Sequence, residues 1–194
     1  MADAPLTIAR SELVLGGQKS GKSRRAELLA RAWLARSPLH CAALVATGQP
    51  WDDEMRERIL RHQADRRVRV PGLATLEEPL WLAEAIARHS SPQRLLVLDC
   101  LTLWLTNLTM PAAGPALVAT EVEARVSGLV RALGAAAGPV VLVGNEIGLG
   151  VIPLGREVRA FVDALGRLNQ AVAAACARVT LMAAGLPLTL KDDT

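Results

Sequence analysis

The sequence contains no tyrosine and a single phenylalanine, Phe161, so the aromatic platforms on which single-stranded nucleic acids stack are scarce. Its three cysteines, Cys41, Cys100 and Cys176, form no Cys-x-x-Cys pair and lack a histidine-rich spacing, which argues against a disulfide framework or a zinc site. Each cysteine is expected to be a small, buried apolar residue.

A strong excess of one charge is also missing. Lysine and arginine together number 22 against 19 acidic residues, giving a net charge of +3, and no run of five basic residues occurs. This mild excess favours small anionic ligands such as nucleotides over a nucleic-acid duplex.

Targeting and membrane segments are not apparent. The first twelve residues carry charges and lack the apolar stretch of a secretory signal, which predicts a cytoplasmic protein. Residues 100–120 carry no charge over a length that could span a membrane. Because this stretch contains Asn107, four threonines and two prolines, it is interpreted as a buried helix followed by a loop.

The 194 residues, 51% of them hydrophobic, suffice for one packed domain over 1–194, with 1–10 as a loose extension. Apolar runs alternate with helical patterns, which predicts an α/β fold with a mostly parallel sheet and helices on both faces. The expected strands are 12–15, 41–47, 95–99, 140–144 and 179–183. The expected helices are 21–36, 52–64, 79–89, 101–108, 120–136 and 156–177. Residues 68–75 are interpreted as an irregular connector.

A phosphate-binding loop is the strongest local signal. Gly16-Gly17-Gln18-Lys19-Ser20-Gly21-Lys22-Ser23 matches Gly-x-x-x-x-Gly-Lys-Ser/Thr in full and lies between a strand pattern and a helix pattern. Glycines let successive backbone N–H groups point at phosphate oxygens, and the helix adds its positive end. Lys22 is expected to reach the β- and γ-phosphates, and the Ser23 hydroxyl to bind Mg²⁺.

A carboxylate for the same magnesium ion is expected at the end of a neighbouring strand. Asp99 terminates the apolar run 95–98 and can supply it. The alternative is that Asp99 only terminates the strand.

The loop alone does not separate kinases, motor ATPases and GTPase switches. Switch GTPases read guanine with an Asn-Lys-x-Asp element, and lysine occurs only at 19, 22 and 191, outside any such element. A small-molecule transferase is therefore favoured, in which the rest of the chain holds an acceptor and excludes water.

His62 lies on a predicted helix that begins with acidic residues and ends with basic ones. Arg58 and Arg66 are four residues before and after it, so the three share a face, and two guanidinium groups would keep the imidazole neutral and hold a phosphate near it. A neutral imidazole is a competent nucleophile toward phosphorus. The alternative is a solvated helix end. His40 and His89 are expected to have structural roles only.

Asn145 and Glu146 follow a buried strand pattern and begin a loop punctuated by glycine. Ligands of open α/β sheets bind at this carboxyl edge, so these residues could face the γ-phosphate or the acceptor. The alternative is a plain turn with a solvated carboxylate.

The motifs resemble those of the bifunctional adenosylcobinamide kinase / adenosylcobinamide-phosphate guanylyltransferase family of cobalamin biosynthesis, nearly end to end. The strings Asn145-Glu146-x-Gly148-x-Gly150-x-x-Pro153 and Gly166-Arg167-x-Asn169-Gln170 are more specific than the phosphate loop. Further matches are Ala46-Thr47-Gly48, Asp53-Glu54-Met55, Arg58-Ile59, Arg61-His62, Glu77-Glu78-Pro79-Leu80, Leu98-Asp99-Cys100-Leu101-Thr102 and Thr106-Asn107-Leu108.

The resemblance implies two reactions. Adenosylcobinamide is first phosphorylated from ATP or GTP; GMP then passes from GTP to that phosphate through a guanylylated histidine, at the position of His62, giving adenosylcobinamide-GDP and pyrophosphate. It also implies a RecA-like P-loop NTPase sheet and a homotrimer with sites between subunits. Because the helix that carries His62 would have to approach the nucleotide for the second reaction, we expect residues 51–66 to move between the two steps. The implied nucleotide-contacting residues outside the phosphate loop are Ala46, Thr47, Gly48, Gln63, Ala64, Asp65, Arg66, Glu77 and Asp99.

One departure concerns residues 67–76, which form a longer connector than family members have. Two alternative functions are a monofunctional kinase in which His62 is inert and a nucleotide-binding regulatory module without turnover.

Overall fold

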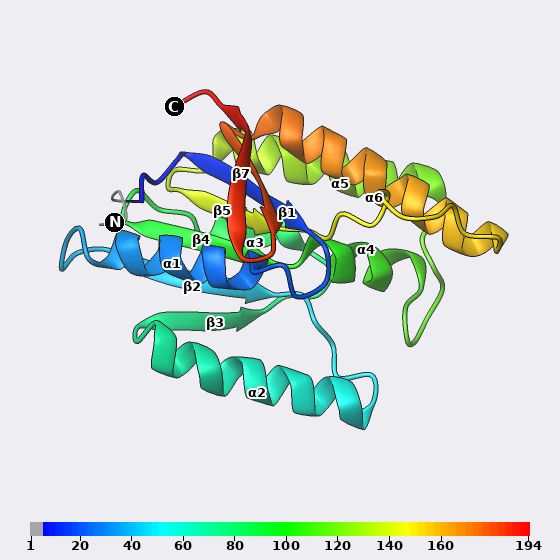
Figure 1. The fold of residues 1–194 in the computed structure, drawn as a ribbon, viewed down its shortest axis with the longest axis horizontal. Helices are drawn as coiled ribbons and strands as arrows, with labels where there is room; N and C mark the ends of the chain where they lie inside the picture. Colours follow the sequence, from blue (N-terminus) through cyan, green and yellow to red (C-terminus); the bar gives the residue numbers. More distant parts are fainter. Residues whose placement is uncertain (1–5) are drawn as a thin grey trace.

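A single twisted sheet organises the chain, which the computed structural model describes over residues 6–194 apart from the side chain of Arg58. Within these residues, seven strands follow the order β3-β2-β4-β5-β1-β6-β7 (Figure 1). Strands β1 to β6 are parallel, and β7 pairs antiparallel with β6. Their bounds are β1 Ser11–Gly16, β2 Cys41–Ala46, β3 Leu73–Glu77, β4 Arg94–Asp99, β5 Val140–Val143, β6 Arg178–Ala183 and β7 Leu186–Asp192.

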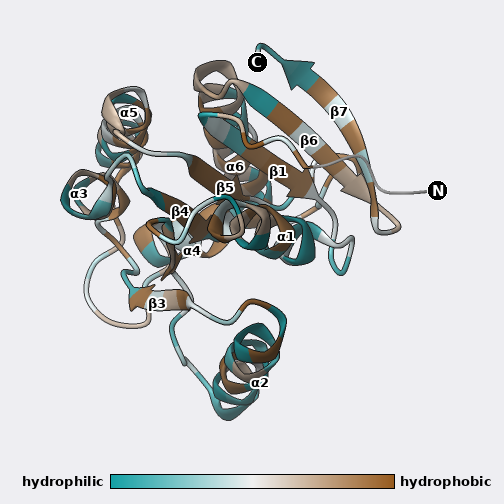
Figure 2. Cartoon of the chain, turned by 90° about the vertical axis from the view of Figure 1, so that its left-hand side faces the viewer, coloured by the Kyte–Doolittle hydropathy of each residue, from teal (hydrophilic) through white to brown (hydrophobic). Residues whose placement is uncertain are grey.

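Helices cover both faces of this sheet. Successive strand residues alternate between two cores: Val14 packs toward α1, and Leu13 and Leu15 pack toward the opposite helices α3 to α6. Figure 2 shows α2 on the same side as α1 but standing apart from the sheet. The bounds are α1 Lys22–Leu34, α2 Asp53–Arg69, α3 Leu82–His89, α4 Leu101–Thr109, α5 Ala119–Ala135 and α6 Arg156–Ala175.

The predicted mostly parallel sheet with helices on both faces is confirmed, and it forms one domain. Three of the strands expected from continuous apolar runs, β2, β4 and β5, are buried along most of their length. All six expected helices are present, with ends that differ from the predicted ones by a few residues.

The interpretation of residues 68–75 as an irregular connector is wrong. α2 continues to Arg69, and β3 begins at Leu73 on the edge of the sheet. Only Leu73 and Leu76 of this strand are half-buried, and its other residues are exposed, so it lacks the continuous apolar run of a central strand. The edge strand β7 was not predicted either, although Leu186, Leu188 and Leu190 alternate along it.

The structure also shows how the uncharged stretch and the amino-terminal residues from 6 onward are folded. Within residues 100–120, α4 buries Trp104 and Leu105 and is followed by a loop, as expected, and the last two residues begin α5. No helix between residues 6 and 194 is long and apolar enough to cross a membrane. Of the extension expected at 1–10, residues 1–5 lie outside the described chain. In the remainder, Ala9 is buried, and Leu6 and Ile8 pack on the α1 side of the core.

Candidate nucleotide-binding site

The phosphate loop joins β1 to α1 and bends sharply where only glycine fits. Gly16 has a φ of +151°, and a Cβ there would lie 2.5 Å from the Met182 carbonyl oxygen. Gly21 has a φ of +103°, and its Cβ would lie 3.2 Å from Gly185 Cα. The β6–β7 turn supports the loop directly, because the Gly185 amide donates to the Ser20 carbonyl over 3.0 Å.

Lys22 and Ser20 lie inside this loop. The Lys22 Nζ donates to the Gly17 carbonyl oxygen over 2.6 Å, and burial lowers the pKa of this ammonium. The Ser20 Oγ is buried without a hydrogen-bond partner in the described part of the chain. A loop that encloses a cation and an unpaired hydroxyl can hold an anionic group such as a phosphate.

Asp99 ends β4 beside the loop. Burial raises the pKa of its carboxyl group, and the opposing influences, in decreasing order, come from Arg66, a hydrogen bond from the Ser23 side chain, His62 and Lys22. The structure therefore brings the two expected magnesium ligands, Ser23 and Asp99, into contact. Hydroxyl and carboxylate oxygens are suitable donors for Mg²⁺, and a nucleotide with water would complete its coordination.

The end of β2 lies beside the end of β4, and its hydrogen bonds go to the backbone of Asp99 and Cys100. The Thr47 amide donates to the Asp99 carbonyl over 3.1 Å. Its hydroxyl donates to the Cys100 carbonyl and accepts from the Cys100 amide, each over 2.8 Å. Ala46 and Gly48 flank this buried threonine, and a Cβ on Gly48 would lie 3.8 Å from Ile59 of α2.

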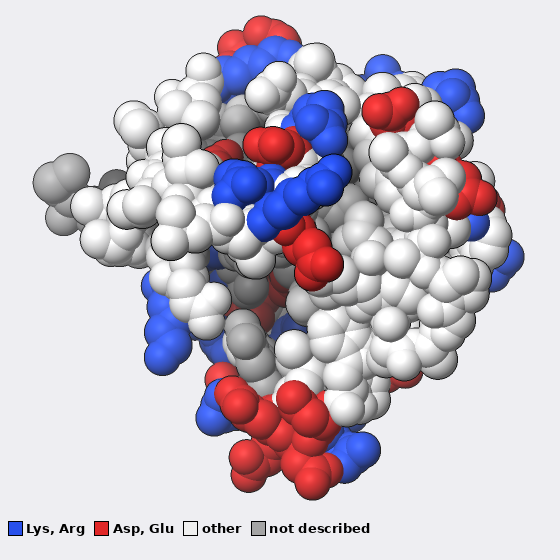
Figure 3. Space-filling model, turned by 90° about the vertical axis from the view of Figure 1, so that its right-hand side faces the viewer, with Lys and Arg blue, Asp and Glu red and all other residues white. Residues whose placement is uncertain are grey.

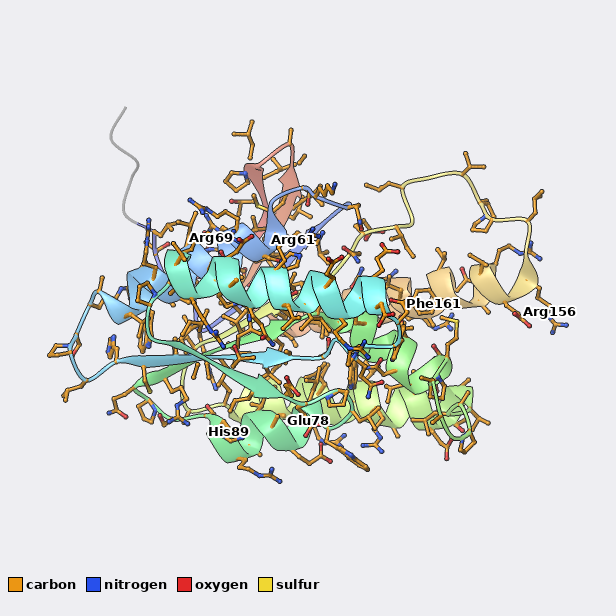
Figure 4. The ribbon with its side chains drawn as sticks, turned by 90° about the horizontal axis from the view of Figure 1, so that it is seen from below. Arg61, Arg69, Glu78, His89, Arg156 and Phe161 are labelled. Carbon is orange, nitrogen blue, oxygen red and sulfur yellow. The ribbon has the colours of Figure 1, made fainter. Side chains whose placement is uncertain are left out.

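α2 carries His62 over this edge of the sheet. Asp52 caps the helix by accepting from the Met55 amide over 2.7 Å, and Figure 3 shows acidic side chains gathered at this amino end. The opposite end is anchored: Arg69 forms ion pairs of 3.2 Å with Glu27 of α1 and 3.1 Å with Asp65 (Figure 4). His62 itself has an exposed side chain and acts electrostatically on Asp99.

A cavity of about 490 Å³ lies between α2 and β3. Three residues of the predicted site converge there, namely Gln63, Arg66 and Glu77. Arg66 is buried; its Nη1 donates to the Thr75 Oγ1 over 3.4 Å, and its Nε has no hydrogen-bond partner among the described residues. Ala64 and Asp65 are exposed and do not line this cavity.

The residues after β5 complete the edge. Val143 is paired with Asp99 on one side and with Val14 of the phosphate-loop strand on the other. The Glu146 amide donates to the Gly16 carbonyl over 3.1 Å. Asn145 and Glu146 therefore lie between the phosphate loop and Asp99.

Buried amides that support this edge were not identified as such from the sequence. The Asn107 Nδ2 donates to the carbonyls of Thr47 and Pro79 over 2.8 and 3.0 Å, and the Asn169 Nδ2 donates to the Asn145 carbonyl over 3.1 Å. Both asparagines lie in sequence strings that match the family, and this match was the only indication in the sequence that they matter. Their roles depend on partners up to 60 residues away in sequence.

A phosphate loop on β1 with a carboxylate two strands away on β4 defines a P-loop nucleotide-binding protein. Solved structures with the same fold include the flagellar accessory protein FlaH from Methanocaldococcus jannaschii, with a TM-score of 0.52 and 10% identity over 96% of this chain and 80% of that one. Another is PH0250 from Pyrococcus horikoshii, with a TM-score of 0.55 and 11% identity over 98% and 90%.

Sequence comparison is more specific. The family model described as cobinamide kinase / cobinamide phosphate guanyltransferase (CobU) matches residues 12–190, and the chain belongs to this family. The bifunctional adenosylcobalamin biosynthesis protein CobP of Pseudomonas aeruginosa is 46% identical over 94% of this chain and 98% of its own length. The CobU proteins of Escherichia coli and Salmonella typhimurium are each 34% identical over 92% and 98%.

Proposed function

We propose that this chain is a bifunctional enzyme that phosphorylates adenosylcobinamide from ATP or GTP and then transfers GMP from GTP to the resulting phosphate. One observation carries the proposal: the phosphate loop and the helix bearing His62 both border Asp99. Family membership supplies the substrates, and this geometry supplies a chemically suitable residue for each step.

In the kinase step, the phosphate loop binds the triphosphate and Lys22 neutralises its β- and γ-phosphates. Ser23 and Asp99 hold Mg²⁺, which supplies further charge neutralisation when bound. The acceptor hydroxyl forms a bond to the γ-phosphorus as the bond to the β-phosphate oxygen breaks. The hydroxyl loses its proton, and the nucleoside diphosphate leaves.

In the guanylyl step, an imidazole nitrogen of His62 forms a bond to the α-phosphorus of GTP, and pyrophosphate leaves. The acceptor phosphate then attacks the same phosphorus, which releases the imidazole. The cavity lined by Gln63, the residue that follows His62, supports a guanine site, because the Glu77 carboxylate in the same cavity can accept from the ring N–H and amino groups of guanine. The anchored carboxyl end of α2 supports a movement of residues 51–66 about that end between steps.

We also propose a cytoplasmic homotrimer with sites between subunits, built from this single transferase domain. Its support is the segment before α6 and the first turn of that helix, which extend away from the body of the chain (Figure 1). This segment exposes large apolar side chains, including Leu149, Val151, Ile152, Leu154 and Val158. Such a group of exposed apolar residues is typical of a surface covered by another subunit.

The test is incubation with GTP labelled at the α-phosphorus, followed by denaturation. The wild-type protein should retain label that is stable to alkali and lost in acid, as a phosphoramidate is. His62→Ala should lose the label and guanylyl transfer while it keeps cobinamide phosphorylation. Lys22→Ala should lose both reactions.

His89→Ala is the matched control, because His89 lies at the carboxyl end of α3, away from α2 (Figure 4). It should behave as wild type. Phosphorylation without any label on the wild-type enzyme would indicate a kinase alone. Nucleotide binding without either reaction would indicate a regulatory module and overturn the proposal.

A further inference from the structure

Glu146 follows β5 at the edge of the sheet that carries the phosphate loop, and its amide donates to the Gly16 carbonyl over 3.1 Å. Strand β5 separates β1, which leads into the phosphate loop, from β4, which ends at Asp99. The Ser23 side chain, which follows β1, forms a hydrogen bond with Asp99 at the end of β4. A terminal phosphate that is bound near both residues would therefore lie over the end of β5, the strand between them. Glu146 lies in the loop that follows the end of β5 and carries a carboxylate.

The backbone around Glu146 is held from three directions. The Glu146 amide donates to the Gly16 carbonyl over 3.1 Å, the Asn145 amide donates to the Thr102 Oγ1 over 2.9 Å, and the Asn169 Nδ2 donates to the Asn145 carbonyl over 3.1 Å. These contacts come from the phosphate loop, α4 and α6. A group that takes part in a reaction must be held in position by its neighbours, whereas a plain surface turn does not need such contacts.

The side chain is also oriented but not closed off. Its Oε1 accepts from the Gly148 amide over 2.8 Å, which fixes the carboxylate and uses one of its oxygens. A Cβ on Gly148 would lie 3.1 Å from that oxygen, so a glycine at this place permits the approach. Glu146 forms no ion pair among those found in residues 6–194, in contrast to Glu12 and Glu27.

The two proposed reactions differ in their need for a base. The first acceptor is an alcohol, which is un-ionised near neutral pH and must lose a proton as it attacks. The second acceptor is a phosphate monoester, whose second pKa of about 6 leaves it largely dianionic at pH 7. Only the first acceptor therefore requires a general base in contact with it.

We propose that Glu146 is the general base of the kinase step, a role that rests on the proposed bifunctional activity. Its free carboxylate oxygen accepts the proton of the attacking hydroxyl. At the same time the hydroxyl oxygen bonds to the γ-phosphorus and the bond to the nucleoside diphosphate breaks. Glu146 takes no part in guanylyl transfer.

The experiment compares Glu146→Gln, Glu146→Asp and the control Glu123→Gln, which changes an exposed residue of α5. Glutamine keeps the acceptor for the Gly148 amide, so the loop should remain folded. Two assays are run on each: phosphorylation of adenosylcobinamide, and GMP transfer to chemically prepared adenosylcobinamide phosphate with detection of the labelled His62 intermediate.

Glu146→Gln should lower kcat for phosphorylation about 10²- to 10⁴-fold with an unchanged KM for nucleotide, while GMP transfer stays within about twofold of wild type. Glu146→Asp, which keeps a base one methylene shorter, should retain more kinase activity than Glu146→Gln. Glu123→Gln should match wild type in both assays.

Full kinase activity in Glu146→Gln, or equal loss of both activities, would overturn the role of Glu146 while leaving the bifunctional assignment intact. A wild-type protein that fails to phosphorylate adenosylcobinamide would overturn both.

Discussion

Replacement of the first two glycines of the phosphate loop by alanine should have opposite outcomes. Gly16 has a φ of +151°, and its added Cβ would lie 2.5 Å from the Met182 carbonyl oxygen, a backbone atom of β6. Gly17 has no positive φ, and its added Cβ would meet nothing within 4 Å. The two substitutions add the same methyl group one residue apart, so each serves as the control for the other.

The magnitude follows from two costs at Gly16. A side chain held in a sparsely populated backbone region costs about 1–3 kcal/mol, and overpacking against fixed atoms costs about 1–3 kcal/mol more. Gly16→Ala should therefore lower the free energy of unfolding by at least about 2 kcal/mol. For a chain of this size that corresponds to a fall in Tm of at least about 4 °C. Gly17→Ala should stay within about 0.5 kcal/mol of wild type.

The assay is thermal unfolding with and without Mg-GTP. A nucleotide at about 100 times its Kd adds about 2.7 kcal/mol to the stability of a binding-competent protein. Wild type and Gly17→Ala should show this rise in Tm, and Gly16→Ala should show little, because its loop can no longer close around phosphate. If both variants lose the same stability, or if Gly16→Ala loses none, the strain and clash assigned to Gly16 are wrong.

Two further predictions concern buried titratable groups. Burial raises the pKa of Asp99, so the native state binds this proton more tightly than the unfolded chain does and loses stability as pH rises from about 4 through the raised pKa. The Tm of Asp99→Asn minus that of wild type, measured without magnesium, should therefore increase with pH; a flat or falling difference would contradict this. Burial also raises the pKa of Cys100 and of Cys176 to about 11. Because only the thiolate reacts, the rate of alkylation at either thiol, followed by mass spectrometry, should rise about tenfold for each pH unit between pH 7 and 10. Complete modification of either within minutes at pH 7.5 would refute it.

The central strands could be predicted because the signal for each one, a continuous apolar run, lies within its own sequence. β2 and β4 are covered on both faces, so their sequences are continuous apolar runs that few other structures explain. β3 lies at the edge and buries only parts of Leu73 and Leu76, which leaves no such run to detect. Its position beside β2 is a long-range property of the fold.

The same distinction applies to the candidate site. The phosphate loop is contained in eight successive residues, whose string specifies both the turn and the lysine. The cavity containing Gln63, Arg66 and Glu77 depends on α2 lying over β3, and β3 is one of the two edge strands that the sequence pattern did not reveal. Resemblance to a family indicated these three residues, but the residues' own spacing could not have brought them together.

The packing of the two candidate sites differs in a way that suits two successive reactions. Glu146 is held by contacts with the phosphate loop, α4 and α6, so the group assigned to phosphoryl transfer has little freedom to move. α2 instead joins the rest of the chain mainly at its carboxyl end, where Arg69 pairs with Glu27, while Leu60 beside His62 is 59% exposed. Elements with few buried contacts open at low free-energy cost. A histidine that must reach the α-phosphorus in one step and leave the γ-phosphate accessible in the other requires such a helix, and a rigid one would favour one reaction at the expense of the other.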